Sequence, residues 1–186
     1  ELNSLDSELI FEDKKVEVYT IPLDHRVYTN GFLFKEKEGE RKLDMNAVLN
    51  ANIDVAYYRK LKQGFDVENQ AGKLIKNETV TLAPEKSKSY AFCSDTAYKQ
   101  AIVNIIKDVD VLYHESTFLE QHAHLAPKTK HSTAKEAASI AKQANVGTLI
   151  LGHYSTRYDD LNVFKTEAQE VFENIELADD GKTFEF

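Results

Sequence analysis

Three apolar segments in the second half of the sequence each end in polar residues that can carry chemistry. The segments are residues 90–93, 109–113 and 148–152, and the residues that follow them are Ser94-Asp95-Thr96, His114-Glu115-Ser116-Thr117 and His153-Tyr154-Ser155. A strand needs a residue that breaks it, but it does not need a histidine or an acid at that place. The carboxyl ends of parallel strands meet at one edge of a sheet, so we expect these residues to build a site together.

The segments between these strands have helical spacing, and strands that alternate with helices predict an α/β fold. We expect helices over residues 98–107 and 161–174, and a third from Ser132 or Thr133 to about residue 145. The third helix has a clear start, because Glu136 follows Thr133 with the spacing of a capping box. Short strands at residues 175–178 and 183–186 are expected to close the chain.

The first half of the sequence predicts antiparallel structure. Residues 8–12 and 15–21 have the pattern of a hairpin, and residues 27–35 indicate another strand. A charged loop is then expected over residues 35–42, followed by two short helices over residues 43–50 and 55–63. Residues 66–86 are expected to be a polar stretch with a short strand. The sequence has no evident repeat or linker, so residues 1–186 are expected to form a single domain.

Composition limits the class of protein. The 186 residues are 42% hydrophobic and 29% charged, as in one globular domain with a core. No apolar run approaches a membrane span, and the first residues lack the features of a signal peptide, so we expect a soluble protein that does not act at a membrane. The single cysteine, Cys93, lies in a predicted core strand. It excludes an intrachain disulfide, argues against a nucleophilic role and fits a cytoplasmic location.

The net charge of −8 argues against a protein that binds nucleic acid over its whole surface. The charge is uneven, however. Residues 59–76 contain only two acids but five basic residues, Arg59, Lys60, Lys62, Lys73 and Lys76. This segment is either a local patch that binds phosphate or an ordinary solvated face.

Two histidines and an acid are candidate metal ligands. His25 and His153 follow apolar strands as Asp95 does, and two imidazoles with a carboxylate suit Zn²⁺. Each of them could instead be a polar strand end, and Asp95 could cap the next helix. His122 and His124 are expected to be exposed in a polar loop. The sequence has no HExxH, GxSxG, P-loop or GxGxxG motif, and its spacing does not favour a Ser-His-Asp triad.

Five motifs, taken in order, resemble those of the ribonuclease Z family, the tRNA 3′-processing endonucleases of the metallo-β-lactamase superfamily. They are Pro22-Leu23-Asp24-His25, Phe92-Cys93-Ser94-Asp95-Thr96, Leu112-Tyr113-His114-Glu115-Ser116-Thr117-Phe118, His131-Ser132-Thr133 and Leu151-Gly152-His153-Tyr154-Ser155-Thr156-Arg157-Tyr158. Each motif alone is weak, but the ordered set covers most of the chain. The resemblance implies a four-layer αβ/βα sandwich, of which this chain would supply mainly the C-terminal half.

The resemblance also implies a two-zinc site. His25 would bind one zinc ion and His153 the other, and Asp95 would bridge them. Such a pair of metal ions can generate hydroxide and neutralise a phosphate. The implied substrate is precursor tRNA, and family members are homodimers.

Further residues take catalytic roles by the same resemblance. His131 would contact the scissile phosphate and protonate the leaving oxygen. His114 and Glu115 form the paired motif whose acid would orient His131, and Arg157 would contact the phosphate. Glu115 could instead belong to a core ion pair, and Arg157 could be a plain surface residue.

The sequence departs from the family in two places. The His-x-His-x-Asp-His metal motif is absent, so residue 1 is expected to lie partway through the fold. We therefore expect this chain alone to bind no stable pair of zinc ions and to lack nuclease activity. The Gly-Pro-rich arm that grips tRNA is also missing, and residues 35–86 would form a reduced arm. Arg59, Lys60 and Lys62 remain candidate phosphate contacts there, with Tyr57 or Tyr58 available for stacking.

Two alternatives remain open from the sequence. The chain could belong to another phosphodiesterase of the metallo-β-lactamase fold, which would share Asp95 and His153 but would not need the His-Ser-Thr loop. It could also be a truncated binding module without catalysis.

Overall fold

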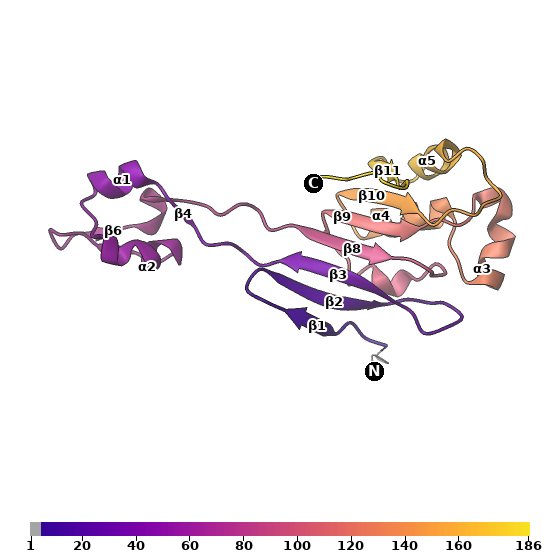
Figure 1. Ribbon diagram of the computed structural model, residues 1–186, viewed down its shortest axis with the longest axis horizontal. Coiled ribbons are helices and arrows are strands. Elements are labelled where there is room, and N and C mark those ends of the chain that lie inside the picture. Colours follow the sequence, from indigo (N-terminus) through magenta and orange to yellow (C-terminus); the bar gives the residue numbers. More distant parts are fainter. Residues whose placement is uncertain (1–4) are drawn as a thin grey trace. The chain divides into compact units, whose positions relative to one another are not determined.

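A seven-stranded sheet is the main element of the larger of two compact units (Figure 1). The computed structural model describes residues 5–186. Within them, the larger unit comprises residues 5–36 and 88–186, and the smaller unit comprises residues 37–87.

The sheet joins an antiparallel half to a parallel half. Its strands, in spatial order, are β1 (Leu9–Glu12), β2 (Val16–Pro22), β3 (Asn30–Glu36), β8 (Ser89–Cys93), β9 (Val111–Glu115), β10 (Thr148–Gly152) and β11 (Ile175–Leu177). Strands β1, β2, β3 and β8 are antiparallel neighbours, and β8 to β11 run parallel. The predicted hairpin and the predicted parallel strands are both confirmed, so the reactive strand ends of β8, β9 and β10 do meet at one edge.

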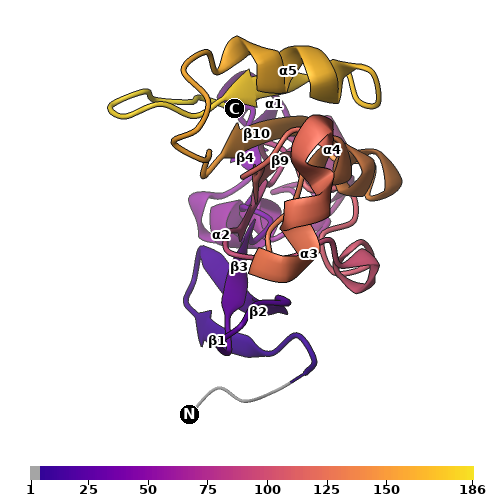
Figure 2. The same cartoon turned by 90° about the vertical axis from the view of Figure 1, so that its right-hand side faces the viewer.

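Helix α4 (Ala134–Gln143) packs beside β9 and β10 on one face of the sheet (Figure 2). Its predicted capping box is present: Thr133 Oγ1 accepts from the Glu136 N–H at 3.2 Å, and Glu136 Oε2 accepts from the Thr133 N–H at 2.8 Å. The alanines of α4 are fully buried and allow the helix to approach the strands closely. Helix α5 (Asn162–Gln169) packs against α4 and β11. The remaining helical segments of this unit are η3 (Gln100–Ile102), η4 (Glu120–Leu125) and α3 (Ala126–Thr129).

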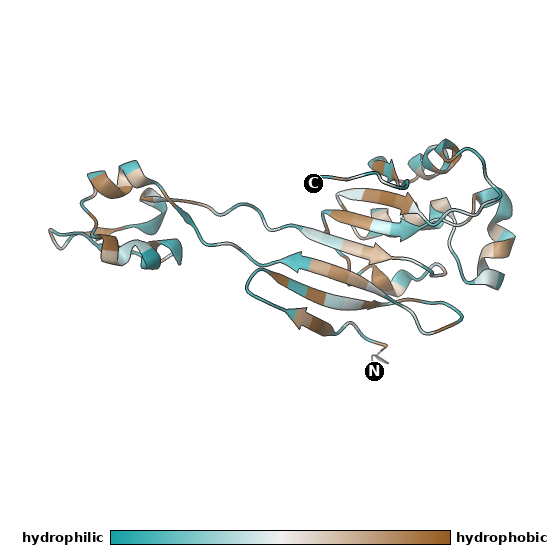
Figure 3. Ribbon diagram, viewed as in Figure 1, coloured by the Kyte–Doolittle hydropathy of each residue, from teal (hydrophilic) through white to brown (hydrophobic). Residues whose placement is uncertain are grey.

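The core lies between the helices and the face of the sheet that carries Ala91, Cys93 and Leu112. Hydrophobic residues are concentrated in the strands (Figure 3). Cys93 is fully buried as predicted, and burial raises the pKa of its thiol to about 12, which agrees with a structural role. Because side chains alternate along a strand, Phe34 and Tyr90 face the opposite side. There they stack at 6.0 Å between ring centroids.

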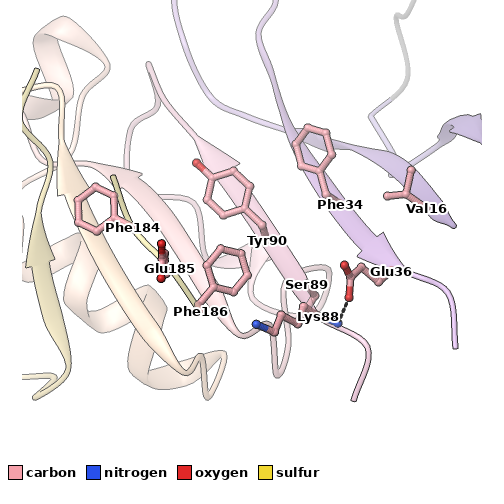
Figure 4. Close-up of a pocket in the computed structure, with 9 residues that line it drawn as sticks. All are labelled: Val16, Phe34, Glu36, Lys88, Ser89, Tyr90, Phe184, Glu185 and Phe186. Carbon is pink, nitrogen blue, oxygen red and sulfur yellow. Dashed lines mark hydrogen bonds between the residues drawn. The ribbon is translucent and has the colours of Figure 1, made fainter. Parts of the chain in front are cut away.

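A cavity of about 480 Å³ lies on this opposite face (Figure 4). Tyr90 and Phe186 are two of its walls, with ring centroids 6.4 Å apart. The cavity is lined by none of the residues that the sequence analysis proposed as functional.

Two predicted elements are wrong, and one is shorter than expected. Residues 98–107 form only the short η3 and a series of turns, in which the Ile105 and Ile106 N–H groups share the Ile102 carbonyl. β-branched side chains lose freedom in a helix, and here Ile102 and Ile106 are buried without one. Residues 183–186 join no ladder in the described part of the chain. Helix α5 ends at Gln169, well before residue 174.

The smaller unit has its own core of Val48, Ile53, Leu61, Val67 and Val80. Its elements are β4 (Lys42–Leu43), α1 (Met45–Asn50), η1 (Val55–Tyr57), α2 (Tyr58–Lys62), β5 (Val67–Glu68), β6 (Leu74–Ile75), η2 (Asn77–Thr79) and β7 (Thr81–Leu82). Buried Asn77 connects its segments, because its Nδ2 donates to the carbonyls of Leu61 and Phe65. In neither unit does a described helix have the length and apolar character needed to cross a bilayer.

Candidate active site

The ends of the parallel strands bring an acid and a histidine together. Asp95 lies two residues beyond β8, and His153 directly follows β10. His153 Nε2 is 3.1 Å from Asp95 Oδ1. Both residues adopt left-handed backbone conformations, with φ of 58° and 57°. Such conformations are unfavourable for residues other than glycine and often accompany functional sites.

His131 lies between the two histidines that the sequence analysis proposed as ligands. Its ring centroid is 5.1 Å from that of His25 and 5.2 Å from that of His153. Ligand atoms of His25, Asp95 and His131 all lie within 4.8 Å of one another, and so do those of Glu115, His131 and His153. Asp95 therefore lies close to both His25 and His153.

Each of these histidines has its Nδ1 atom held by a neighbour. His25 Nδ1 donates to the Lys130 carbonyl at 2.9 Å, and His131 Nδ1 donates to Glu115 Oε1 at 2.7 Å. A carbonyl or a carboxylate can only accept, so both Nδ1 atoms carry a proton and the two Nε2 atoms are left without these bonds. His153 Nδ1 lies 2.9 Å from Thr117 Oγ1, a hydroxyl that can donate or accept.

Glu115 is fully buried and forms hydrogen bonds with four other residues of the site. Oε1 accepts from the Thr96 N–H at 2.7 Å as well as from His131. Oε2 accepts from the Ser132 N–H at 3.0 Å and from the Thr117 hydroxyl at 2.7 Å. A buried carboxylate needs several donors, and these bonds fix the orientation of His131 in return.

His114 does not join this cluster, although the sequence analysis grouped it with Glu115. It is fully buried, and alternation along β9 turns its side chain to the opposite face, in register with Cys93 and Leu151. His114 Nδ1 donates to the Glu115 carbonyl at 2.7 Å, and burial lowers the pKa of the ring. The structure thus gives His114 a supporting place behind Glu115.

Arg157 lies at the rim of the cluster. It is exposed, and its guanidinium carbon is 6.0 Å from the centroid of the Phe118 ring. The Phe118 ring in turn meets His131 edge-on at 6.5 Å. Arg59, Lys60 and Lys62 belong to the smaller unit, where all three are exposed on α2.

Sequence reasoning missed two residues that hold the candidate ligand side chains. Lys130 has a left-handed backbone with φ of 61°, and it both accepts from His25 and pairs with Asp24 at 3.0 Å. Thr117 contacts both Glu115 and His153. Thr117 belongs to a stretch that was singled out, but only the fold shows which side chains it reaches. Nothing in the sequence marks Lys130.

Gly152 is packed too tightly to accept a side chain. A Cβ atom there would lie 2.2 Å from the Tyr113 hydroxyl oxygen and 2.6 Å from Cζ of that ring, which stacks on Phe92. We expect Gly152→Ala to lower the free energy of unfolding by about 1–3 kcal/mol through overpacking. Chemical denaturation measures the change. Gly39→Ala is the matched control, because its nearest contact would be an ordinary 3.7 Å. Equal stability of the two variants would contradict the prediction.

Comparison with known proteins places the chain beside one enzyme family. No protein-family model matches it. Ribonuclease Z of Cytophaga hutchinsonii is 45% identical over 185 residues, which cover 98% of this chain and 58% of that protein. Ribonuclease Z of Porphyromonas gingivalis is 45% identical over 175 residues, which cover 92% of this chain and 58% of that protein. The chain thus spans less than two thirds of the length of these curated relatives.

Solved structures show the fold. The metallo-β-lactamase fold protein YhfI from Bacillus subtilis matches with a TM-score of 0.61 at 15% identity, over 94% of this chain and 52% of that one. The short form of human tRNase Z matches with a TM-score of 0.54 at 21% identity, over 94% of this chain and 44% of that one. The chain therefore has about half of a metallo-β-lactamase fold, as the motifs implied.

Proposed function

The chain is related to ribonuclease Z over nearly its whole length, and from this relationship we propose that it forms part of a zinc-dependent endoribonuclease that removes the 3′ trailer from precursor tRNA. The single observation that carries the proposal is the Glu115–His131 pair, with Nδ1 of His131 held at 2.7 Å. This pair lies between two other histidines that have Asp95 beside them. The arrangement combines a metal-binding set with an oriented acid, as phosphodiester hydrolysis requires.

The donor set fits zinc. His25 and His153 offer imidazole nitrogen and Asp95 offers carboxylate oxygen, which are ligands that Zn²⁺ commonly takes. When bound, two zinc ions would polarise the phosphate and lower the pKa of a water molecule. Three protein ligands are few for two metal ions. We therefore propose that the complete site needs further ligands of the His-x-His-x-Asp-His kind.

His131 and Arg157 would act on the substrate itself. The Nδ1–H of His131 is fixed on Glu115, so a proton on Nε2 faces the site and can pass to the leaving 3′ oxygen. The buried carboxylate of Glu115 stabilises the positive charge of the doubly protonated ring. Arg157 would add positive charge beside the phosphate as negative charge develops. We further propose a cytoplasmic homodimer whose partner is precursor tRNA.

Cleavage of precursor tRNA by the full-length gene product tests this function, with zinc titration alongside. Bis-p-nitrophenyl phosphate is the comparison substrate. Faster turnover of this small diester, with precursor tRNA left uncut, would favour a general phosphodiesterase. The 186-residue chain alone is expected to bind no stable pair of zinc ions and to leave precursor tRNA uncut. Cleavage by the chain alone would show that its own ligands suffice.

The smaller unit would act as the reduced arm that contacts tRNA. Arg59, Lys60 and Lys62 lie on one short helix, and no ion pair is recorded for them in the described part of the chain. The Lys60 ammonium lies 5.7 Å from the centroid of the Tyr57 ring, so an aromatic face and cations occur together. Cationic and aromatic side chains are what RNA-binding surfaces use.

Replacing Arg59, Lys60 and Lys62 with alanine is expected to raise the KM for precursor tRNA and to flatten its salt dependence. Each lost phosphate contact lowers the slope of log affinity against log salt by about 0.7–0.9, the range for single-stranded and double-stranded nucleic acid. Lys14, Lys15 and Lys107 to alanine is the control with the same change in charge, because these three exposed lysines belong to the larger unit. An equal rise in KM for both sets would remove α2 from the proposed interface.

A further inference from the structure

Thr117 lies between Glu115, which orients His131, and the candidate metal ligand His153. Its Oγ1 is 2.7 Å from Glu115 Oε2, 2.9 Å from His153 Nδ1 and 3.1 Å from the His153 carbonyl oxygen. Its exposed fraction is 7%, so little water competes for these contacts. No other hydroxyl group among the described residues is recorded in contact with both Glu115 and His153.

The backbone fixes this hydroxyl in place. The Ser116 N–H donates to the Gly152 carbonyl at 2.8 Å, and the Ser155 N–H donates to the Thr117 carbonyl at 3.1 Å. On the other side, the Phe118 N–H donates to the Ser132 carbonyl at 3.2 Å. Residues 116–118 are therefore bonded to the loop that carries His153 and to the loop that carries His131.

A hydroxyl has one proton, and burial decides which neighbour receives it. Glu115 Oε2 belongs to a fully buried carboxylate that can only accept, and it is the nearest of the three atoms. A hydrogen bond to an ionised acceptor is about twice as strong as one between neutral groups. The Thr117 proton therefore goes to Glu115, and the lone pairs of Oγ1 are left to accept from His153 Nδ1.

Asp95 competes for the same imidazole proton from the other side of the ring. Its Oδ1 is 3.1 Å from His153 Nε2, and a proton on Nε2 could be donated to it. The Asp95 side chain is 46% exposed, however, so water can solvate its carboxylate. The Thr117 oxygen is enclosed and has no such alternative, which favours the proton on Nδ1.

We propose that Thr117 is a positioning residue that keeps the proton of His153 on Nδ1 and so leaves the Nε2 lone pair free for a metal ion. One hydroxyl would then connect the acid that orients His131 to the tautomer of a metal ligand. The inference rests on the proposed function only in taking His153 as a ligand. The placement of the proton can be measured without metal or substrate.

The test uses the metal-free, full-length gene product labelled with ¹⁵N-histidine. Long-range ¹H–¹⁵N spectra above about pH 8 report the tautomer, because ordinary histidines with a pKa of about 6.5 are then neutral. His153→Gln assigns the signals. We expect Nδ1–H in the unsubstituted protein and in Thr117→Ser, and a shift to Nε2–H in Thr117→Val. Zinc affinity should fall about 10–100-fold in Thr117→Val, as for other residues that support ligands, and Thr117→Ser should restore it.

Two results would overturn the proposal. One is Nε2–H at His153 in the unsubstituted protein, which needs no variant and so does not depend on whether Thr117→Val folds. The other is an unchanged tautomer and zinc affinity in folded Thr117→Val. Nδ1–H in a protein that leaves precursor tRNA uncut would refute the proposed function while supporting the role of Thr117.

Discussion

Replacing His131 with alanine is expected to lower kcat for precursor tRNA by about 10²–10⁴-fold, the usual contribution of a general acid. The ring of His131 is held by Glu115 and lies between His25 and His153. Single-turnover cleavage isolates the chemical step. His124→Ala is the control, because His124 is an exposed histidine in the nearby η4.

Zinc binding by the same variant separates two roles for His131. His131 belongs to two groups of side chains whose ligand atoms lie within 4.8 Å of one another and could hold a metal ion. As a proton donor, His131 can be removed while the zinc content stays the same. If His131 is a ligand, its removal would lower the zinc content. A fall in kcat together with a lost zinc ion would therefore contradict the role proposed here.

Glu115→Gln is expected to affect stability and catalysis together. The glutamine has the same shape, but one of its two oxygens becomes an NH₂ group that must face donors. Oε1 meets the Thr96 N–H and the His131 ring, and Oε2 meets the Ser132 N–H and the Thr117 hydroxyl. Each donor left without an acceptor in this buried site costs about 1–3 kcal/mol.

The free energy of unfolding should therefore fall by several kcal/mol, and kcat should fall by up to the loss seen in His131→Ala, because His131 loses its orientation. Urea unfolding and cleavage kinetics measure the two effects. The exposed Glu173→Gln is the matched control and should stay within about 0.5 kcal/mol. A stable Glu115→Gln variant would mean that the buried acid is not needed as an acceptor.

The parallel half of the sheet was predictable because its strands are short apolar runs with polar ends. Each of the residues Asp95, Glu115 and His153 is at or just beyond a strand end, and parallel topology alone brings them to one edge. The capped start of α4 was predictable for a local reason as well, since the side chains of Thr133 and Glu136 each accept from the other's backbone N–H.

Other features depend on contacts that no local pattern contains. Residues 98–107 have helical spacing, yet Ile102 and Ile106 are buried in turns against the core. His114 and Glu115 are adjacent in sequence, but the strand sends them to opposite faces, so pairing them as one motif merged a core residue with a site residue. Thr117 and His153 are 36 positions apart in the sequence, and their contact forms only because β9 and β10 are paired.

The left-handed backbone at Asp95 and His153 would set the stability of the fold against the proposed binding of metal. Each such residue costs about 1–2 kcal/mol relative to a relaxed backbone, and glycine would avoid most of that cost. Glycine offers no donor atom, however. Selection for thermal resistance in the absence of zinc would therefore favour glycine at these two positions, whereas selection for a bound metal would retain the acid and the imidazole. A library of variants selected under each of these two conditions would thus distinguish residues that stabilise the fold from residues that bind metal at a cost in stability.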